Sequence, residues 1–97
     1  MIVILVNSKE LLLKAKEGKY AIPASNVFNL MSIQAVLEAA KKRNSPLIVA
    51  LAEVHLESIS IQECAMIVKS LAETMDQKIV LHFDHGFTKE KVIEAID

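Results

Sequence analysis

The sequence predicts an α/β fold, in which an N-terminal helix is followed by about three β/α units whose parallel strands form part of a TIM (β/α)8 barrel. Segments with helical hydrophobic periodicity alternate with short apolar runs along the 97 residues, and this alternation is typical of parallel sheets with right-handed crossovers. The run Pro46–Ala52 is apolar throughout, as expected for a strand that is covered on both faces. An open flavodoxin-like sheet would show the same local pattern, but no glycine-rich phosphate loop follows the first predicted strand.

The first predicted elements are a helix and a strand. The helix spans residues 8–17, where Asn7 or Ser8 can cap its start and Gly18 is placed to end it. The strand spans residues 20–27 and ends in polar side chains. This strand opens the first β/α unit.

The next two units follow the same pattern. A helix over residues 30–43 begins after the N-cap Asn29 and ends in a basic turn, where the helix dipole favours cations. The stretch Ser60–Glu63 has the spacing of a capping box and opens a helix over residues 61–75. Residues 78–83 form the third predicted strand.

Thr88 is the predicted cap of a fourth helix, with Val92, Ile93 and Ile96 on its inward face. This helix reaches Asp97 without a C-terminal cap. A closed barrel needs eight strands and roughly 250 residues. We therefore expect residues 1–97 to be a single N-terminal fragment of a barrel domain.

Composition narrows the classes of function. The chain is 53% hydrophobic and 24% charged, which excludes disorder, and its net charge of −1 without a basic patch argues against a nucleic-acid partner. No apolar run is long enough to cross a membrane, and Met1–Val6 lacks the basic flank and the cleavage site of a signal peptide. The single Cys64 sits on an apolar helical face and fits a reducing compartment, so we expect a cytoplasmic protein.

Three titratable residues lie close together at the end of the third predicted strand. His82, Asp84 and His85 occur at the end of an apolar run, and Gly86 follows them. Charged groups at the end of a hydrophobic strand are costly unless they are paired or bind something. Side chains alternate along a strand, so His82 and Asp84 share the face away from the helices. His85 is then the first loop residue, and we expect Gly86 to permit the sharp exit.

Polar side chains also follow the first two strands. Ser25 and Asn26 end the first strand, and Glu53 follows the second. The carboxyl ends of parallel strands meet at one edge, which is where (β/α)8 barrels place their active sites. We expect a site at this edge.

Three stretches resemble class II metal-dependent ketose-bisphosphate aldolases, such as the fructose- and tagatose-bisphosphate aldolases. They are Tyr20–Val27, Asn44–Ile48 and His82–Gly86, which occur in the order and spacing of that family. The resemblance runs from about Leu5 to Asp97 and corresponds to the first three of eight barrel units. It implies a lyase of carbohydrate metabolism, as in glycolysis, that cleaves a phosphorylated ketose into dihydroxyacetone phosphate and an aldehyde with the help of Zn²⁺.

The resemblance also implies residue roles. His85 matches a zinc ligand, Asp84 matches the acid/base carboxylate that handles the C4 hydroxyl proton, and Asn26 matches a position near the substrate. His82 and Glu53 are candidates for supporting the site. The remaining zinc ligands and the phosphate-binding loop would come from later strands of the barrel.

The sequence departs from the family at two strand ends. Ser25 stands where a Phe is common, and Ala52 followed by Glu53 stands where many members carry a Ser. The identity of the ketose therefore stays open.

Two alternatives remain. One is an inactive barrel fragment that acts through self-association or a partner, because three parallel strands leave sheet edges open. A homo-oligomer, or completion by the rest of a barrel, would cover them. The other is a metallo-β-lactamase-like hydrolase, whose zinc motif requires a histidine where Val80 stands and whose fold expects antiparallel strands.

Overall fold

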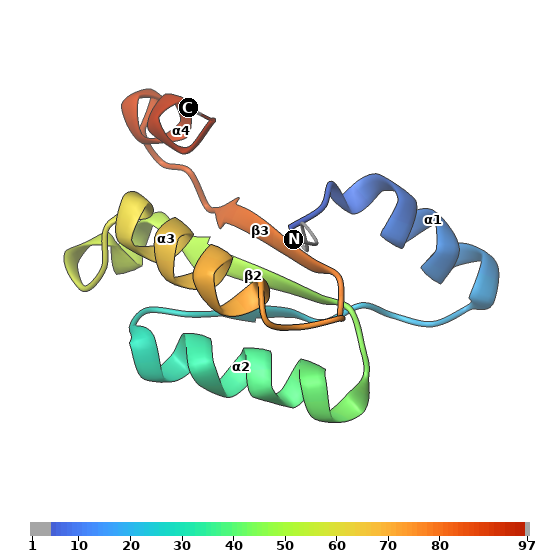
Figure 1. The fold of residues 1–97 in the computed structure, drawn as a ribbon. Coiled ribbons are helices and arrows are strands. Elements are labelled where there is room, and N and C mark those ends of the chain that lie inside the picture. The colour runs from blue at the N-terminus through green and yellow to red at the C-terminus, as the bar shows by residue number, and fades with distance from the viewer. Residues whose placement is uncertain (1–4, 97) are drawn as a thin grey trace.

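The computed structural model describes residues 5–96, which form a three-stranded parallel sheet in the order β1-β2-β3 with helices between the strands (Figure 1). Residues 1–4 and Asp97 lie outside the described residues. The expectations about Met1–Val6 and about the end of the last helix rest in part on these residues. The elements are α1 (Ser8–Gly18), β1 (Ala24–Asn26), α2 (Leu30–Arg43), β2 (Leu47–Ala52), the 3₁₀ helix η1 (Glu53–Glu57), α3 (Ile61–Ala72), β3 (Ile79–Asp84) and α4 (Lys89–Ile96). The predicted α/β arrangement of a partial barrel is confirmed.

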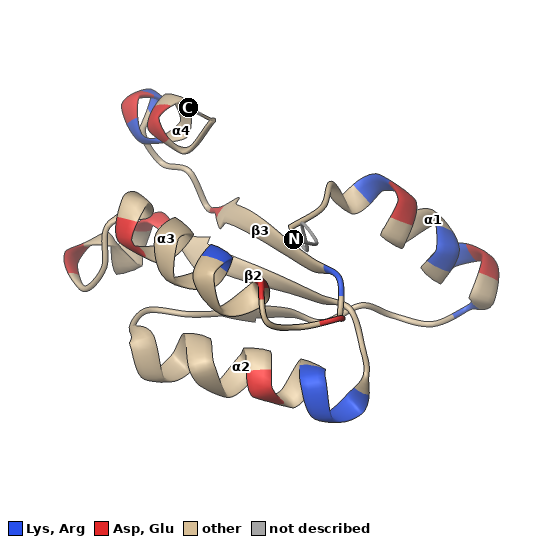
Figure 2. Cartoon of the chain, in the orientation of Figure 1, with Lys and Arg blue, Asp and Glu red and all other residues tan. Residues whose placement is uncertain are grey.

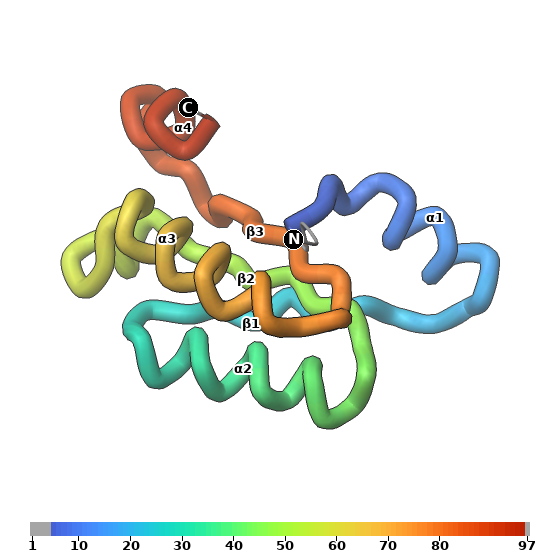
Figure 3. Tube along the Cα trace, viewed as in Figure 1, coloured from blue at the N-terminus to red at the C-terminus, as the bar shows by residue number. Residues whose placement is uncertain are grey.

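Helices α2 and α3 lie side by side over one face of the sheet (Figure 3). The apolar residues of these helices and of the strand faces toward them form one core. The largest fully buried side chains in it are those of Val27, Ile33, Val49, Cys64, Val68 and Ile79. Burial of this apolar surface fixes which face of each strand is left for polar side chains.

The predicted helix caps are confirmed. Asn7 and Asn29 cap α1 and α2 through side-chain oxygens that accept backbone N–H groups. Ser60 and Glu63 form the predicted capping box at the start of α3, and Thr88 Oγ1 accepts the N–H of Lys91 in α4. Each cap supplies acceptors for N–H groups that a helix start leaves without intrahelical partners.

Two predicted elements are shorter in the structure. Strand β1 covers only Ala24–Asn26, because the N–H of Tyr20 donates to the C=O of Ala15 at the end of α1 and Pro23 has no N–H for the ladder. Helix α3 ends at Ala72 rather than at residue 75. There the hydroxyl of Thr74 donates to the C=O of Leu71, a side-chain bond that competes with helix continuation.

Gly18 does not end α1 by adopting the left-handed conformation. Gly18 is the last helical residue, and Lys19 takes the left-handed position with φ 56°. At the end of α2, Asn44 plays the same part with φ 49°. Asparagine tolerates this conformation better than most residues, whereas lysine has no side-chain compensation for it.

The predicted inward face of α4 is wrong for this structure. Val92, Ile93 and Ile96 are all exposed, and α4 lies beyond the end of β3 (Figure 1), where it approaches the strand near Gly86. An amphipathic helix buries its apolar stripe only where a second layer covers it. The residues from 5 to 96 provide no such layer for α4.

The charges are distributed without a continuous stripe of one sign. Lys and Arg gather in the last turn of α2, whereas α1 and α4 carry both signs (Figure 2). No helix within residues 5–96 has the length and apolar character needed to cross a lipid bilayer.

Candidate functional site

The end of β3 brings three titratable side chains together. Nε2 of His82 lies 3.6 Å from Oδ1 of Asp84, and Nε2 of His85 lies 3.4 Å from Oδ2 of the same carboxylate. These contacts are ionic only when the imidazoles are protonated. The carboxylate side chain is 31% exposed, so it is partly shielded between the two rings and still reachable from solvent.

His85 adopts the left-handed backbone conformation, with φ 50°. Its N–H donates to Oδ1 of Asp84 at 3.0 Å, which ties the start of the loop to the last residue of the strand. A non-glycine residue in this region is strained, and such strain clusters at functional sites. The imidazole is 67% exposed, and its ring stacks on that of Phe87 with centroids 6.4 Å apart.

Gly86 does not make the sharp exit from β3, because the positive φ belongs to His85. The reason for a glycine is space. A Cβ at position 86 would lie 2.5 Å from Cγ2 of Val92 and 3.4 Å from Cε2 of Phe83. Gly86 therefore allows α4 to approach the end of β3.

The strand register places Asn26 on the same face as the β3 cluster. Asn26 pairs with Ala50, and Ala50 pairs with His82, so the three residues form one row across the sheet. Asp84 lies one step further toward the carboxyl end, opposite Ala52. Ala50 and Ala52, which lie between the polar groups of β1 and β3, are themselves buried.

Ser25 faces the other way, toward α2, where it lines a small groove with Val36 and Ala39. It is therefore not part of the cluster around Asp84. The departure from the family at this position lies on the helix side of the sheet.

Glu53, a predicted candidate for supporting the site, makes contacts that the sequence did not reveal. Its Oε1 accepts the N–H of Phe87 at 2.9 Å, the N–H of Thr88 at 3.1 Å and the hydroxyl of Thr88 at 3.4 Å. The loop between β3 and α4 is thus attached to the end of β2. One sequence signal could have pointed to this contact. In α3 the N3 residue Glu63 accepts the backbone N–H of the N-cap residue, but the N3 residue of α4 is Lys91, which has no acceptor, so the N–H of Thr88 needs one from elsewhere.

His55 lies at the same end of the sheet, in η1. Its ring tilts against Phe28 with centroids 5.6 Å apart, and its buried Nδ1 has no hydrogen-bond partner. No described contact joins it to the cluster around Asp84.

The donor groups of the cluster fit a zinc ion only in part. The exposed imidazole of His85 is a suitable ligand at the open end of the sheet. Catalytic zinc takes about three protein ligands. The residues from 5 to 96 contain no group of three His, Cys, Asp or Glu side chains that could hold a metal ion.

Cys64 lies in the core on α3 and is fully buried, as predicted. Burial raises the pKa of its thiol. The thiol form is a poor nucleophile and metal ligand. Cys64 is therefore a packing residue.

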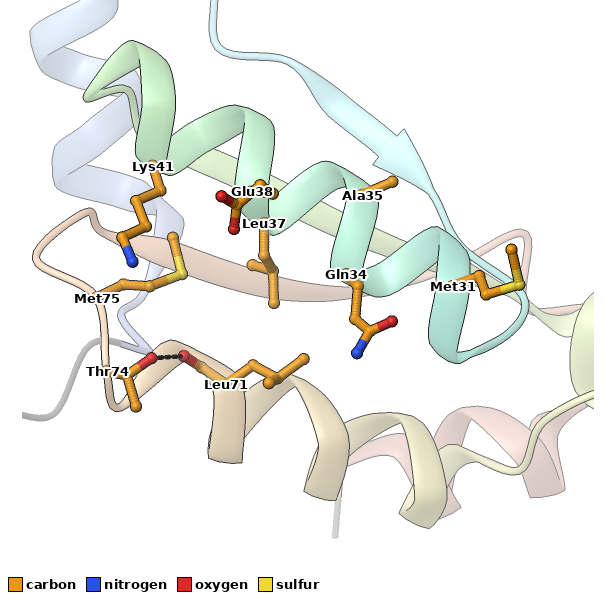
Figure 4. Close-up of a pocket in the computed structure, with 9 residues that line it drawn as sticks. All are labelled: Met31, Gln34, Ala35, Leu37, Glu38, Lys41, Leu71, Thr74 and Met75. Carbon is orange, nitrogen blue, oxygen red and sulfur yellow. Dashed lines mark hydrogen bonds between the residues drawn. The ribbon is translucent and has the colours of Figure 1, made fainter.

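A larger groove of about 540 Å³ lies between α2 and α3, on the helix side of the sheet (Figure 4). Its walls are mainly apolar, with Met31, Leu37, Leu71 and Met75 among them. The polar groups of its lining are those of Gln34, Glu38, Lys41 and Thr74. It lies on the opposite face from Asn26 and Asp84, so it is separate from the candidate site.

The chain is similar to proteins of one enzyme family. The profile of the family described as "Fructose-bisphosphate aldolase class-II" matches residues 6–97. A fructose-bisphosphate aldolase of Mycoplasma genitalium is 46% identical over 85 residues, which are 84% of this chain and 30% of that protein. A 6-phospho-5-dehydro-2-deoxy-D-gluconate aldolase of Halalkalibacterium halodurans is 38% identical over 96 residues, or 96% of this chain and 33% of that protein.

Solved structures agree with the sequence relatives. The YdjI aldolase of Escherichia coli K12 superposes with a TM-score of 0.87 at 25% identity, covering 95% of this chain and 35% of that one. A putative fructose-1,6-biphosphate aldolase from Coccidioides immitis gives 0.73 at 28% identity, covering 86% and 31%. The chain thus spans about a third of the length of these relatives. With the parallel strands and the family match over nearly all of its residues, the chain belongs to the class II fructose-bisphosphate aldolase family.

Proposed function

We propose that this chain contributes the β1–β3 part of an aldolase site that reversibly cleaves a ketose bisphosphate into dihydroxyacetone phosphate and an aldehyde. The observation that carries the proposal is the position of Asp84. Its partly exposed carboxylate lies at the carboxyl end of β3, between two imidazoles and on the face of the sheet that the helices leave open.

Asp84 is the proposed acid/base group. In the cleavage direction its carboxylate takes the proton of the C4 hydroxyl, the C3–C4 bond breaks as the C4 carbonyl forms, and the bonding electrons pass to the ketose fragment as an enediolate. In the condensation direction the same carboxyl group returns the proton. Such proton transfer contributes about 10²–10⁴-fold to rate.

Asn26 is the proposed substrate contact. It lies in the same row of the sheet as His82, with Ala50 of β2 between them, and Asp84 lies in the next row toward the carboxyl end of β3. The exposed amide of Asn26 both donates and accepts hydrogen bonds, as binding of a sugar hydroxyl across this end of the sheet requires. His82 supports the site by its contact with Asp84.

His85 is the proposed zinc ligand, and the other ligands would come from strands beyond these three. Zinc, when bound, would act as a Lewis acid that stabilises the enediolate. The left-handed backbone of His85 and its N–H bond to Asp84 hold ligand and proton shuttle next to each other. We place the enzyme in carbohydrate metabolism, because its relatives are named as aldolases of phosphorylated sugars. We place it in the cytoplasm, because the free thiol of Cys64 fits a reducing compartment.

The test is aldol cleavage of fructose and tagatose bisphosphates, followed by release of dihydroxyacetone phosphate. It should be run on this chain and on any longer polypeptide that contains it, with the intact mass and the zinc content of each sample. We expect Asp84→Ala to lower turnover by about 10²–10⁴-fold. Asp76→Ala is the matched control, since Asp76 is exposed and lies just before the amino end of β3, away from Asp84. Turnover that survives Asp84→Ala, or that zinc chelation leaves unchanged, would contradict the proposal.

A second candidate function is that of a barrel piece that associates with itself or with a partner chain. The exposed apolar residues Phe87, Val92, Ile93 and Ile96 beside the end of β3 favour it. If these 97 residues act alone, we expect an oligomeric or partly molten protein without aldolase activity. A monomer with a sharp unfolding transition and turnover would overturn this alternative. The parallel strands do not match the antiparallel ones that a metallo-β-lactamase-like hydrolase requires.

A further inference from the structure

The N-cap residue of a helix also carries a backbone N–H that needs an acceptor, and α4 has no side chain of its own that accepts the N–H of its N-cap residue Thr88. In α2 and α3 the N3 residues Ser32 and Glu63 bond back to the backbone N–H of the N-cap residue. In α4 the N3 residue is Lys91, which has no acceptor. The N–H of Thr88 is nevertheless satisfied, because Glu53 accepts it from the end of β2.

The capping box of α4 is therefore completed across the sheet. One oxygen of Glu53 also accepts the N–H of Phe87 and the hydroxyl of Thr88, from residues 34 and 35 positions further along the chain. A carboxylate at a helix start is further favoured by the helix dipole. This attachment fixes the far end of the loop that begins at His85.

The near end of the same loop is fixed by the bond from the His85 N–H to Asp84. The backbone is thus held on both sides of Gly86, by Asp84 at the N–H of His85 and by Glu53 at the N–H of Phe87, and His85 has the left-handed conformation within this held segment. Without a far attachment, the strain at His85 would be released by rotation of the loop.

We propose that Glu53 is a positioning residue, which holds the β3–α4 loop so that His85 stays in its left-handed conformation beside Asp84. The aldolase role of His85 rests on the proposed function, whereas the attachment itself stands on the hydrogen bonds. Phe87, whose ring stacks on His85, is held by the same carboxylate.

The attachment can be tested by NMR on the isotopically labelled chain, without any activity. We expect Glu53→Ala to lower the hydrogen-exchange protection of the Phe87 and Thr88 amides by about tenfold, as loss of a charge-assisted hydrogen bond implies. We also expect it to weaken the strong intraresidue HN–Hα NOE that positive φ produces at His85. Glu57→Ala is the matched control, because Glu57 is exposed in the same 3₁₀ helix.

Glu53→Gln supplies the conservative variant. Its side-chain oxygen can accept the same N–H groups without the charge, so we expect it to keep part of the protection and the His85 NOE. Retention of both signals in Glu53→Ala, or a loss in Glu53→Gln as complete as in Glu53→Ala, would overturn the inference. These readouts do not depend on Asp84 catalysis, so failure of the attachment and failure of the aldolase proposal give different results.

Discussion

Replacing Ile33 with alanine should destabilise the protein by about 2–5 kcal/mol, in the range of buried large-to-small substitutions. Ile33 lies on α2, is fully buried and belongs to the core between that helix and the sheet. The substitution removes three carbons, and at about 0.8 kcal/mol each their transfer from water is worth roughly 2.4 kcal/mol. The cavity left behind adds to this loss, because neighbouring side chains relax only in part.

The size of this loss is large compared with the stability of a small domain, which is about 5–15 kcal/mol. Ile33→Val, which removes one methylene group, should cost only about 0.5–1.5 kcal/mol. The two variants therefore form a graded series at one position.

Urea unfolding followed by circular dichroism measures these free energies, provided that the denaturant slope stays unchanged. Met31→Ala is the control on the same helix, since Met31 is 77% exposed and should change stability by no more than about 0.5 kcal/mol. A loss below about 1 kcal/mol for Ile33→Ala, with an unchanged slope, would refute the packing of α2 on the sheet.

Three further predictions concern local features. Burial raises the pKa of the Cys64 thiol, so we expect alkylation of the native protein to be much slower than alkylation in concentrated guanidinium chloride. Mass spectrometry measures both rates, and similar rates would contradict the burial of Cys64. Hydrogen bonds from the backbone and side chain of Ser60 lower the pKa of Glu63 from its ordinary value of 4.5. The stability that ionised Glu63 provides is therefore present above pH 4.5 and is lost as the pH falls through its lowered pKa. The difference in unfolding free energy between wild type and Glu63→Gln should shrink on acidification. A difference that does not depend on pH would contradict the capping box at Ser60. Lys19→Gly should raise the unfolding free energy by about 0.5–1 kcal/mol, because glycine relieves the left-handed φ of 56°; thermal unfolding would reveal a decrease instead if the position were not left-handed.

The sequence was sufficient for features that depend on near neighbours. The caps at Asn29, Ser60 and Thr88 were predictable, because each joins groups three residues apart. The apolar run of β2 and the alternation along β3 predicted which face carries His82 and Asp84. These are local or periodic signals, so a single sequence carries them.

The tertiary structure alone decided the features that depend on strand register and on covering layers. The bond of Glu53 to the loop after β3 joins residues 34 and 35 positions apart, and it exists because β2 and β3 end side by side. The left-handed turn fell on His85, whose N–H donates to Asp84, and not on Gly86, which instead makes room for Val92. The apolar stripe of α4 predicted burial, but a stripe is buried only where another layer meets it, and its own sequence does not say whether one does.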